Sequence, residues 1–225
     1  MIRIALAAAL ALVSTAAVAQ EATTQAAPDA APAPVATPAP PPGPPPQRAG
    51  TVRVTLTTSE GPILIELDKD KAPITVANFL KYVDTKRYDG KTFYRVVPVP
   101  GLTDQGLVQG GMKFDPRQMF PPIAHEPTTK TGLSHTSGTI SMGRNAPGSA
   151  TSEFFIIVGD MDYMNANPSQ PGDNQGYAAF GHVVAGLDNV KKILASPVSP
   201  TDGPPGMKGQ FLVKPVKIVT ARRAG

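Results

Sequence analysis

The sequence predicts a β-rich α+β domain over residues 51–225, preceded by an export signal and a proline-rich linker. Three observations predict this class. Apolar and polar residues alternate in several short segments, helical spacing appears in only two segments, and glycine and proline fill the connections. A domain of this length can bury one full hydrophobic core.

The first residues have the features of a secretory signal. Arg3 supplies the positive start, and residues 4–13 form an apolar run that is too short to span a bilayer. Ala17-Val18-Ala19 has the small-x-small pattern of a cleavage site. We therefore expect a signal peptide over residues 1–19, an exported, periplasmic protein, and no membrane-spanning segment in the mature chain.

The next segment, residues 20–50, consists almost entirely of Ala, Pro, Thr and Gln and has no aromatic residue. Such a composition cannot bury enough apolar surface to offset the entropy lost on ordering. We expect a disordered linker that is partly polyproline II. A ligand for a proline-binding module is the alternative, and it is less favoured because no flanking charges fix a register.

The domain begins with a hairpin and a helix. Residues 52–58 alternate cleanly, residues 63–67 alternate less cleanly, and Ser59-Glu60-Gly61-Pro62 between them predicts a turn. Residues 72–83 then change to helical spacing, with Pro73 in the first turn. The predicted buried stripe of this helix consists of Ile74, Ala77, Phe79, Leu80 and Val83.

Further strands and a second helix follow along the chain. The predicted strands are residues 92–97, 107–111, 138–142, 153–158, 178–183 and 211–220. Residues 187–194 predict the second helix. Many short strands with two helices favour a β-barrel covered by helices.

Charge and composition exclude several classes of function. The net charge is only +4, and no basic stripe alternates with aromatic residues, so we expect no nucleic acid partner. The chain has no Cys, so disulfides cannot stabilise it. Its three His are widely spaced and lack metal-ligand patterns, so we expect them in surface or structural positions, with no metal and no cofactor.

The most informative segment is residues 144–156, where a turn-rich stretch leads into Phe154-Phe155. Neighbouring residues in a strand point to opposite faces, so one ring can fill a core while the other lines a surface pocket. The alternative is that both rings belong to the core. Three other segments favour the pocket: residues 92–98, 108–111 and 176–181.

Taken in order, these segments resemble the cyclophilin-type peptidyl-prolyl cis–trans isomerases of the bacterial exported branch. Residues 57–61, 67–73, 121–123 and 138–142 match further segments of that family, and the resemblance extends from Thr51 to Arg222. It implies a closed eight-stranded antiparallel β-barrel capped by two α-helices. It also implies that proline-containing polypeptides are the substrates. We expect the protein to act as a monomer.

The resemblance implies that Arg95 is the catalytic residue. As an X–Pro amide twists, its nitrogen gains a lone pair that a fixed donor can stabilise. A guanidinium is always charged and offers several donors in a planar fork. Without the resemblance, we would interpret Arg95 as a solvated side chain on the polar face of a strand.

The resemblance also implies a set of substrate-binding residues. Gln109 matches a contact to the peptide, Phe155 matches the floor of the proline pocket, and Leu107 and Met164 match its apolar walls. Tyr163 and Tyr177 match flat walls with polar tips. Gly143, Arg144 and Asn145 match the stretch that pairs with the substrate backbone.

The sequence departs from the family pattern at three places. Residues 98–106 contain an insertion that puts Gly106 where a pocket aromatic is usual, and Leu102 is a candidate to replace that ring. Glu153 stands where glutamine is usual. We expect this carboxylate to pair with Arg95, which would either orient the guanidinium or tie up the donor and lower activity, and we expect the Arg charge to lower its carboxyl pKa. Residues 165–175 lengthen a loop that either shapes access to the pocket or, as we slightly favour, is neutral.

The leading hypothesis is therefore an isomerase that assists the folding of exported proteins. The alternative, supported by Gly106 and Glu153, is a non-catalytic peptide-binding module or chaperone on the same fold. A carbohydrate-binding or structural β domain is a remote third reading, because it requires exposed aromatic platforms.

Overall fold

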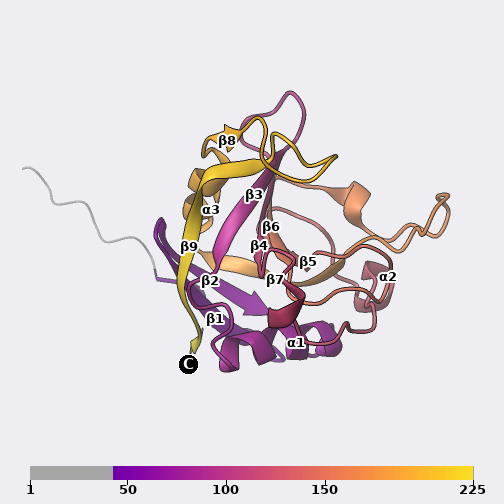
Figure 1. Ribbon diagram of the computed structural model, residues 1–225. Coiled ribbons are helices and arrows are strands. Elements are labelled where there is room, and N and C mark those ends of the chain that lie inside the picture. The colour runs from indigo at the N-terminus through magenta and orange to yellow at the C-terminus, as the bar shows by residue number, and fades with distance from the viewer. Residues whose placement is uncertain (1–42, 225) are drawn as a thin grey trace, which may run out of the picture. The chain divides into compact units, whose positions relative to one another are not determined.

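Eight antiparallel strands close into a barrel in the computed structural model, which describes residues 43–224 (Figure 1). The order around the ring is β1-β2-β7-β5-β6-β4-β3-β9, and pairing of β1 with β9 closes it. A short ninth strand, β8, pairs with β9. The predicted closed barrel is confirmed, and closure leaves the eight ring strands without a free edge.

The strands of the ring follow the predicted segments closely. They are β1 (Val52–Thr58), β2 (Gly61–Leu67), β3 (Thr92–Pro98), β4 (Gly106–Gly111), β5 (Thr139–Met142), β6 (Phe154–Val158), β7 (Ala178–Ala185) and β9 (Phe211–Ala224), with β8 at Val198–Ser199. The hairpin turn is tighter than expected, because β2 already begins at Gly61.

Two helices, α1 (Pro73–Asp84) and α3 (Leu187–Leu194), cover the two ends of the barrel (Figure 1). The structure adds a single-turn helix, α2 (Thr128–Thr131), and two 3-10 turns, Pro116–Gln118 and Asp162–Met164. Within residues 43–224, none of the helices combines the length and the apolar character that crossing a membrane requires.

The buried face of α1 differs from the predicted stripe. Ile74 and Ala77 are exposed, whereas Thr75 and Val76 are buried together with the predicted Phe79, Leu80 and Val83. The cause is the buried Glu126, whose carboxylate accepts hydrogen bonds from the backbone N and the hydroxyl of Thr75, at 2.8 and 2.7 Å. These bonds draw Thr75 inward and satisfy a free N–H group at the start of the helix.

An aromatic cluster fills the space between α1 and the barrel wall. Phe154 meets Phe79 edge-on at 5.3 Å between ring centroids, and Tyr88 and Phe93 pack against Phe154 from other sides. All four rings are fully buried. The cluster fixes β6 against α1, and thereby sets the direction in which the next residue, Phe155, points.

The predicted signal peptide, residues 1–19, lies outside the described residues, as does the linker as far as residue 42. The linker residues that are described contact the barrel. Arg48 pairs with Glu66 at 2.6 Å and with Asp68 at 3.2 Å, and Pro45 accepts a hydrogen bond from Arg53. The contacts of the domain therefore begin upstream of Thr51.

Candidate active site

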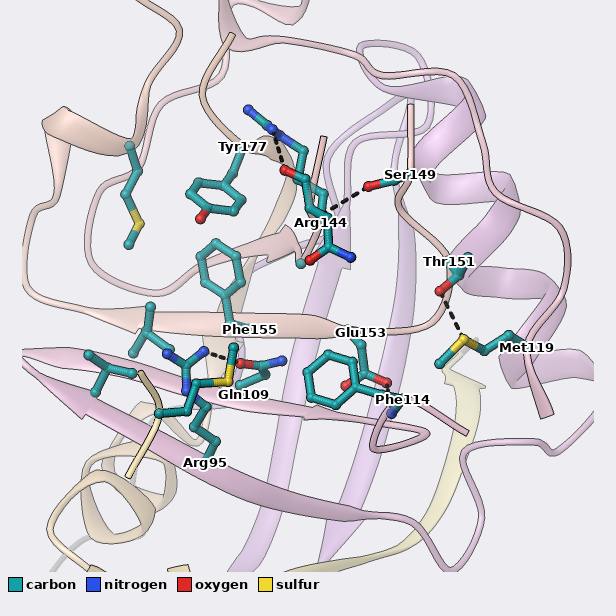
Figure 2. Close-up of a pocket in the computed structure, with 16 residues that line it drawn as sticks. Arg95, Gln109, Phe114, Met119, Arg144, Ser149, Thr151, Glu153, Phe155 and Tyr177 are labelled. Carbon is teal, nitrogen blue, oxygen red and sulfur yellow. Dashed lines mark hydrogen bonds between the residues drawn. The ribbon is translucent and has the colours of Figure 1, made fainter. Parts of the chain in front are cut away.

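A cavity of about 560 Å³ opens on the barrel wall where β3, β4 and β6 lie side by side (Figure 2). Its lining includes ten of the eleven predicted site residues: Arg95, Leu107, Gln109, Gly143, Arg144, Asn145, Glu153, Phe155, Met164 and Tyr177. These residues come from segments far apart in the sequence, and the barrel brings them together.

Tyr163 is the predicted site residue that the structure does not place in the pocket. Its side chain is 75% exposed and contacts the sulfur of Met161. Tyr163 is the middle residue of the 3-10 turn Asp162–Met164, in which successive side chains point in different directions. The turn that directs Met164 inward therefore directs Tyr163 outward.

Phe155 forms the apolar floor of the pocket. Its neighbour Phe154 belongs to the central core, whereas Phe155 clusters with Leu107 and Met164, as the alternation of a strand predicts. The ring of Tyr177 stands perpendicular to Phe155 at 5.3 Å, and the buried imidazole of His135 stacks behind it at 6.4 Å. This floor can hold the ring of a proline residue.

Arg95 lies beside this floor with its guanidinium fixed by two glutamines. Its Nη1 donates to Gln109 Oε1 at 2.7 Å, and its Nε donates to Gln210 Oε1 at 2.8 Å. Burial lowers the pKa of Arg95, but a guanidinium remains protonated across the physiological range. The site thus holds a charged donor in a fixed orientation next to an apolar seat (Figure 2).

A β-bulge at Tyr94 brings two consecutive side chains to the same glutamine. The register of β3 shifts between Phe93 and Arg95 against both neighbouring strands. Tyr94 and Arg95 consequently both bond to Gln109, although neighbours in a regular strand would point apart.

The expected pairing of Glu153 with Arg95 is wrong. The Glu153 carboxylate instead accepts a hydrogen bond from the hydroxyl of Tyr94 at 2.5 Å. Gln109 and Tyr94 lie between the two charged groups. The expected lowering of its pKa is also wrong, because burial raises the pKa of the Glu153 carboxyl, and its partners Tyr94, Ser152 and Phe114 carry no positive charge that would offset this effect.

The insertion before β4 does not supply the missing aromatic wall. Leu102 is 42% exposed and does not line the pocket, whereas Val99 in the same connection packs against the Phe155 cluster. A side chain at Gly106 would place its Cβ 2.6 Å from the carbonyl oxygen of Val97 and 2.8 Å from Leu194 Cδ1. The space beside Gly106 is therefore already filled by β3 and by Leu194 of α3.

The longer loop, residues 165–175, is linked to the pocket through Arg144. The guanidinium of Arg144 binds both carboxylate oxygens of Asp173, at 2.8 and 2.9 Å, and lies over the ring of Tyr177. Only 6% of the Arg144 side chain is exposed. The loop thus holds the pocket residue Arg144 in place. This favours the interpretation that the loop shapes access to the pocket over the interpretation that the loop is neutral.

Several pocket residues carry no signal in the sequence. Phe114 and Met207 line the cavity, and Gln210 holds Arg95, yet all three come from irregular segments. Phe114 reaches the pocket because Lys113 and Phe114 both adopt positive φ, at 52° and 61°. Within residues 43–224, no group of three or more His, Asp or Glu side chains is arranged to hold a metal ion.

Comparison with known proteins assigns the family. The family model for cyclophilin type peptidyl-prolyl cis-trans isomerases matches residues 53–223. The chain is 38% identical to a peptidyl-prolyl cis-trans isomerase of Acinetobacter baylyi over 173 residues, which cover 75% of this chain and 84% of that protein. It is 37% identical to peptidyl-prolyl cis-trans isomerase A of Dickeya dadantii, over 76% of this chain and 84% of that protein.

A solved structure shows the same fold. The crystal structure of a cyclophilin type isomerase from Cryptosporidium parvum superposes with a TM-score of 0.60 at 19% identity, covering 78% of this chain and 98% of that one. The strand order, the pocket and these relatives all indicate the same family. The chain belongs to the cyclophilin-type family and is a peptidyl-prolyl cis–trans isomerase.

Proposed function

We propose that this isomerase accelerates rotation about X–Pro bonds in exported proteins while they fold. In this proposal Phe155 seats the proline ring, and Arg95 donates a hydrogen bond to the nitrogen of the twisted amide. The observation that carries the proposal is the guanidinium of Arg95, which is held by Gln109 and Gln210 beside an apolar floor.

The chemistry needs only these two elements. Rotation about a planar amide has a barrier of about 18–20 kcal/mol, because the C–N bond has partial double-bond character. The twisted state loses that character, and its nitrogen becomes a better acceptor. A donor fixed in a low-dielectric pocket stabilises the twisted state more than either planar state, and this difference lowers the barrier.

Around this centre, the remaining pocket residues would hold the peptide. Leu107 and Met164 flank the floor, and Gly143 to Asn145 lie at its rim after β5. An extended peptide placed there can pair with their backbone groups, as in strand addition. Gln109 uses one of its two amide N–H donors on Tyr94, and the other can be offered to a peptide carbonyl.

The test is an isomerisation assay on an Ala-Pro peptide with the chain from Gln20 to Gly225. We expect Arg95→Ala to lower kcat/KM by on the order of 100-fold, the usual loss for one fixed donor to a developing charge. Arg117→Ala is the matched control, because Arg117 is an exposed arginine outside the pocket. Full activity in Arg95→Ala would refute the assigned role of Arg95. A folded wild type without activity would favour the peptide-binding module or chaperone.

The exported location is a separate part of the proposal and rests on the signal sequence. Expression of the whole chain in a Gram-negative host, followed by fractionation and N-terminal sequencing, tests it. We expect a periplasmic protein that begins at Gln20. An intact chain in the cytoplasmic fraction would contradict export.

A further inference from the structure

A chain of hydrogen bonds connects the buried carboxylate of Glu153 to the guanidinium of Arg95. The hydroxyl of Tyr94 donates to Glu153 Oε2 at 2.5 Å, and Gln109 Nε2 donates to the Tyr94 oxygen at 2.8 Å. Arg95 Nη1 then donates to Gln109 Oε1 at 2.7 Å. Figure 2 shows Gln109 between Arg95 and Glu153 on the pocket wall.

Along this chain of hydrogen bonds, the donor and acceptor of every bond are fixed by the chemistry of the groups. An ionised carboxylate can only accept, so Tyr94 must direct its single hydrogen at Glu153. The Tyr94 oxygen is then left to accept from the amide nitrogen of Gln109. With its nitrogen committed to Tyr94, Gln109 presents its oxygen to Arg95, which can only donate.

We propose that Tyr94 and Glu153 are positioning residues that act through Gln109 to fix the guanidinium of Arg95. The inference rests on the proposed function of Arg95 as the catalytic donor. It extends that function to Tyr94, which does not line the pocket and is only 1% exposed, and to Glu153, which lines the pocket but bonds to Tyr94.

The surroundings of Glu153 support its role as an acceptor. Besides the Tyr94 hydroxyl, the carboxylate accepts from the hydroxyl of Ser152 at 3.2 Å and from the backbone N of Phe114 at 3.4 Å. All three of these groups donate to the carboxylate. A glutamine at this position could turn its amide nitrogen toward Tyr94, and the direction of the whole chain would no longer be fixed.

Protonation of Glu153 would also remove the fixed direction of the hydrogen bonds. The hydrogen-bond chain is therefore sensitive to acid. The titratable and charged groups around it are Tyr94, Tyr82, Tyr88, Arg95 and Arg144. Tyrosines stay neutral and arginines stay charged in mildly acidic solution, so Glu153 is the group of this set that titrates there. Its pKa is raised by burial from the ordinary value of 4.5, so it takes up a proton before an exposed glutamate would.

A protonated Glu153 needs an acceptor for its new hydrogen, and the nearest is the Tyr94 oxygen. Tyr94 would then direct its own hydrogen at Gln109, which would have to turn its oxygen toward Tyr94 and its amide nitrogen toward Arg95. Two donors would face each other, and Arg95 would lose one of its two fixed partners. We therefore expect kcat to fall as the pH falls through the raised pKa of Glu153.

The experiment measures kcat and KM by exchange NMR on an Ala-Pro peptide, from about pH 5 to about pH 8. For Tyr94→Phe at neutral pH we expect kcat to fall roughly threefold to tenfold with little change in KM, because the nitrogen of Gln109 loses the hydrogen bond that fixes it. For Glu153→Gln we expect the decline of kcat at acid pH to become smaller, and a remaining decline is assigned to His135, which stacks behind Phe155. An unchanged decline would refute the acid sensitivity of Glu153. Tyr88→Phe is the matched control, because Tyr88 is buried nearby and donates to the backbone of Ser152 without joining the chain.

Two further measurements separate positioning from a merely structural role. In the Arg95→Ala background, Tyr94→Phe should cause no additional loss, because the group it positions is gone. In the protein that keeps Arg95, Tyr94→Phe should speed hydrogen exchange at the Arg95 side chain. An equal loss in both backgrounds, or unchanged exchange, would refute the inference. Full activity in Arg95→Ala would instead refute the proposed role of Arg95 itself.

Discussion

The side-chain oxygen of Gln210 accepts hydrogen bonds from two nitrogens of Arg95, a residue 115 positions away in the sequence. With the bond from Nη1 to Gln109, three of the five N–H donors of the guanidinium are in use. The other two remain for a substrate. Gln210 and Gln109 thus hold the planar fork from two sides, and neither its tilt nor its depth in the pocket can change without breaking one of these bonds.

We expect Gln210→Ala to lower kcat about tenfold, because the loss of this acceptor leaves the guanidinium free to rotate on one side. Gln210→Glu should retain most of the activity, since a carboxylate also accepts from both nitrogens. Steady-state assays with the Ala-Pro peptide check both. The control is Gln118→Ala, a glutamine that binds Lys91 outside the pocket. Equal rates for the two Gln210 variants would contradict the role of the acceptor.

The ion pair between Arg144 and Asp173 leads to a second prediction. We expect Asp173→Asn to raise KM severalfold with little change in kcat, because Arg144 would lose the carboxylate that holds it at the rim of the pocket. Arg144 lowers the pKa of Asp173 to about 2, so the pair persists at every pH above about 4. KM should therefore show no pH dependence from this pair in that range.

Hydrogen exchange offers an independent test of the same pair. The backbone amides of residues 165–175 should exchange faster in Asp173→Asn, since the loop loses its attachment to Arg144. Asp188→Asn is the control, because Asp188 is an exposed acid paired with Lys191 on α3. Unaltered KM and exchange in Asp173→Asn would show that the loop does not act on the pocket.

Gly106 gives a third prediction, which concerns stability. The Cβ of an alanine would lie 2.6 Å from the carbonyl oxygen of Val97 and 2.8 Å from Cα of Pro98, both backbone atoms that cannot move aside easily. We expect Gly106→Ala to lower the free energy of unfolding by about 1–3 kcal/mol, the usual cost of overpacking. Urea unfolding measures it. Gly43→Ala is the control, because no atom lies within 4 Å of its added Cβ.

The barrel strands were predictable because their side chains alternate with the period of a strand. Val54 and Leu56 of β1 are fully buried, and polar neighbours separate them, so the pattern identified the strand and its inner face. The same logic separated Phe154 from Phe155. Helical spacing, in contrast, placed Ile74 of α1 wrongly on the buried face. The reason is that Thr75 turns inward toward Glu126, a residue 51 positions away in the sequence.

Most of the pocket was predictable because its residues lie in motifs that the family shares, but their partners were not. Whether Glu153 meets Arg95 depends on a bulge at Tyr94 that shifts the register of β3 against two strands. Gln210 approaches Arg95 only because β9 pairs with β3. Tyr163 points outward because of a 3-10 turn. The periodicity of the sequence does not predict these three features, since each depends on a local irregularity or on long-range pairing.

His135 supports the floor of the pocket in its neutral form. Its Nδ1 donates to Asn165 Oδ1 at 2.7 Å, an oxygen that also accepts from the His135 backbone N, and its Nε2 accepts from the Ser141 hydroxyl at 3.0 Å. The side chain is fully buried, and burial lowers its pKa from the ordinary value of 6.5. A proton on Nε2 would face the Ser141 hydroxyl and require it to turn away.

The lowered pKa of His135 makes stability depend on pH with a definite sign. The unfolded chain takes up the proton at its ordinary pKa near 6.5, and the folded protein only at a lower pH, so the unfolded state is favoured progressively between these two values. We expect the free energy of unfolding to fall as the pH decreases below about 6.5 and to fall less in His135→Gln. Urea unfolding at a series of pH values measures the slope. His125→Gln, at a partly exposed histidine, is the control substitution. A slope in His135→Gln as steep as that of the wild type would assign the acid sensitivity to another group.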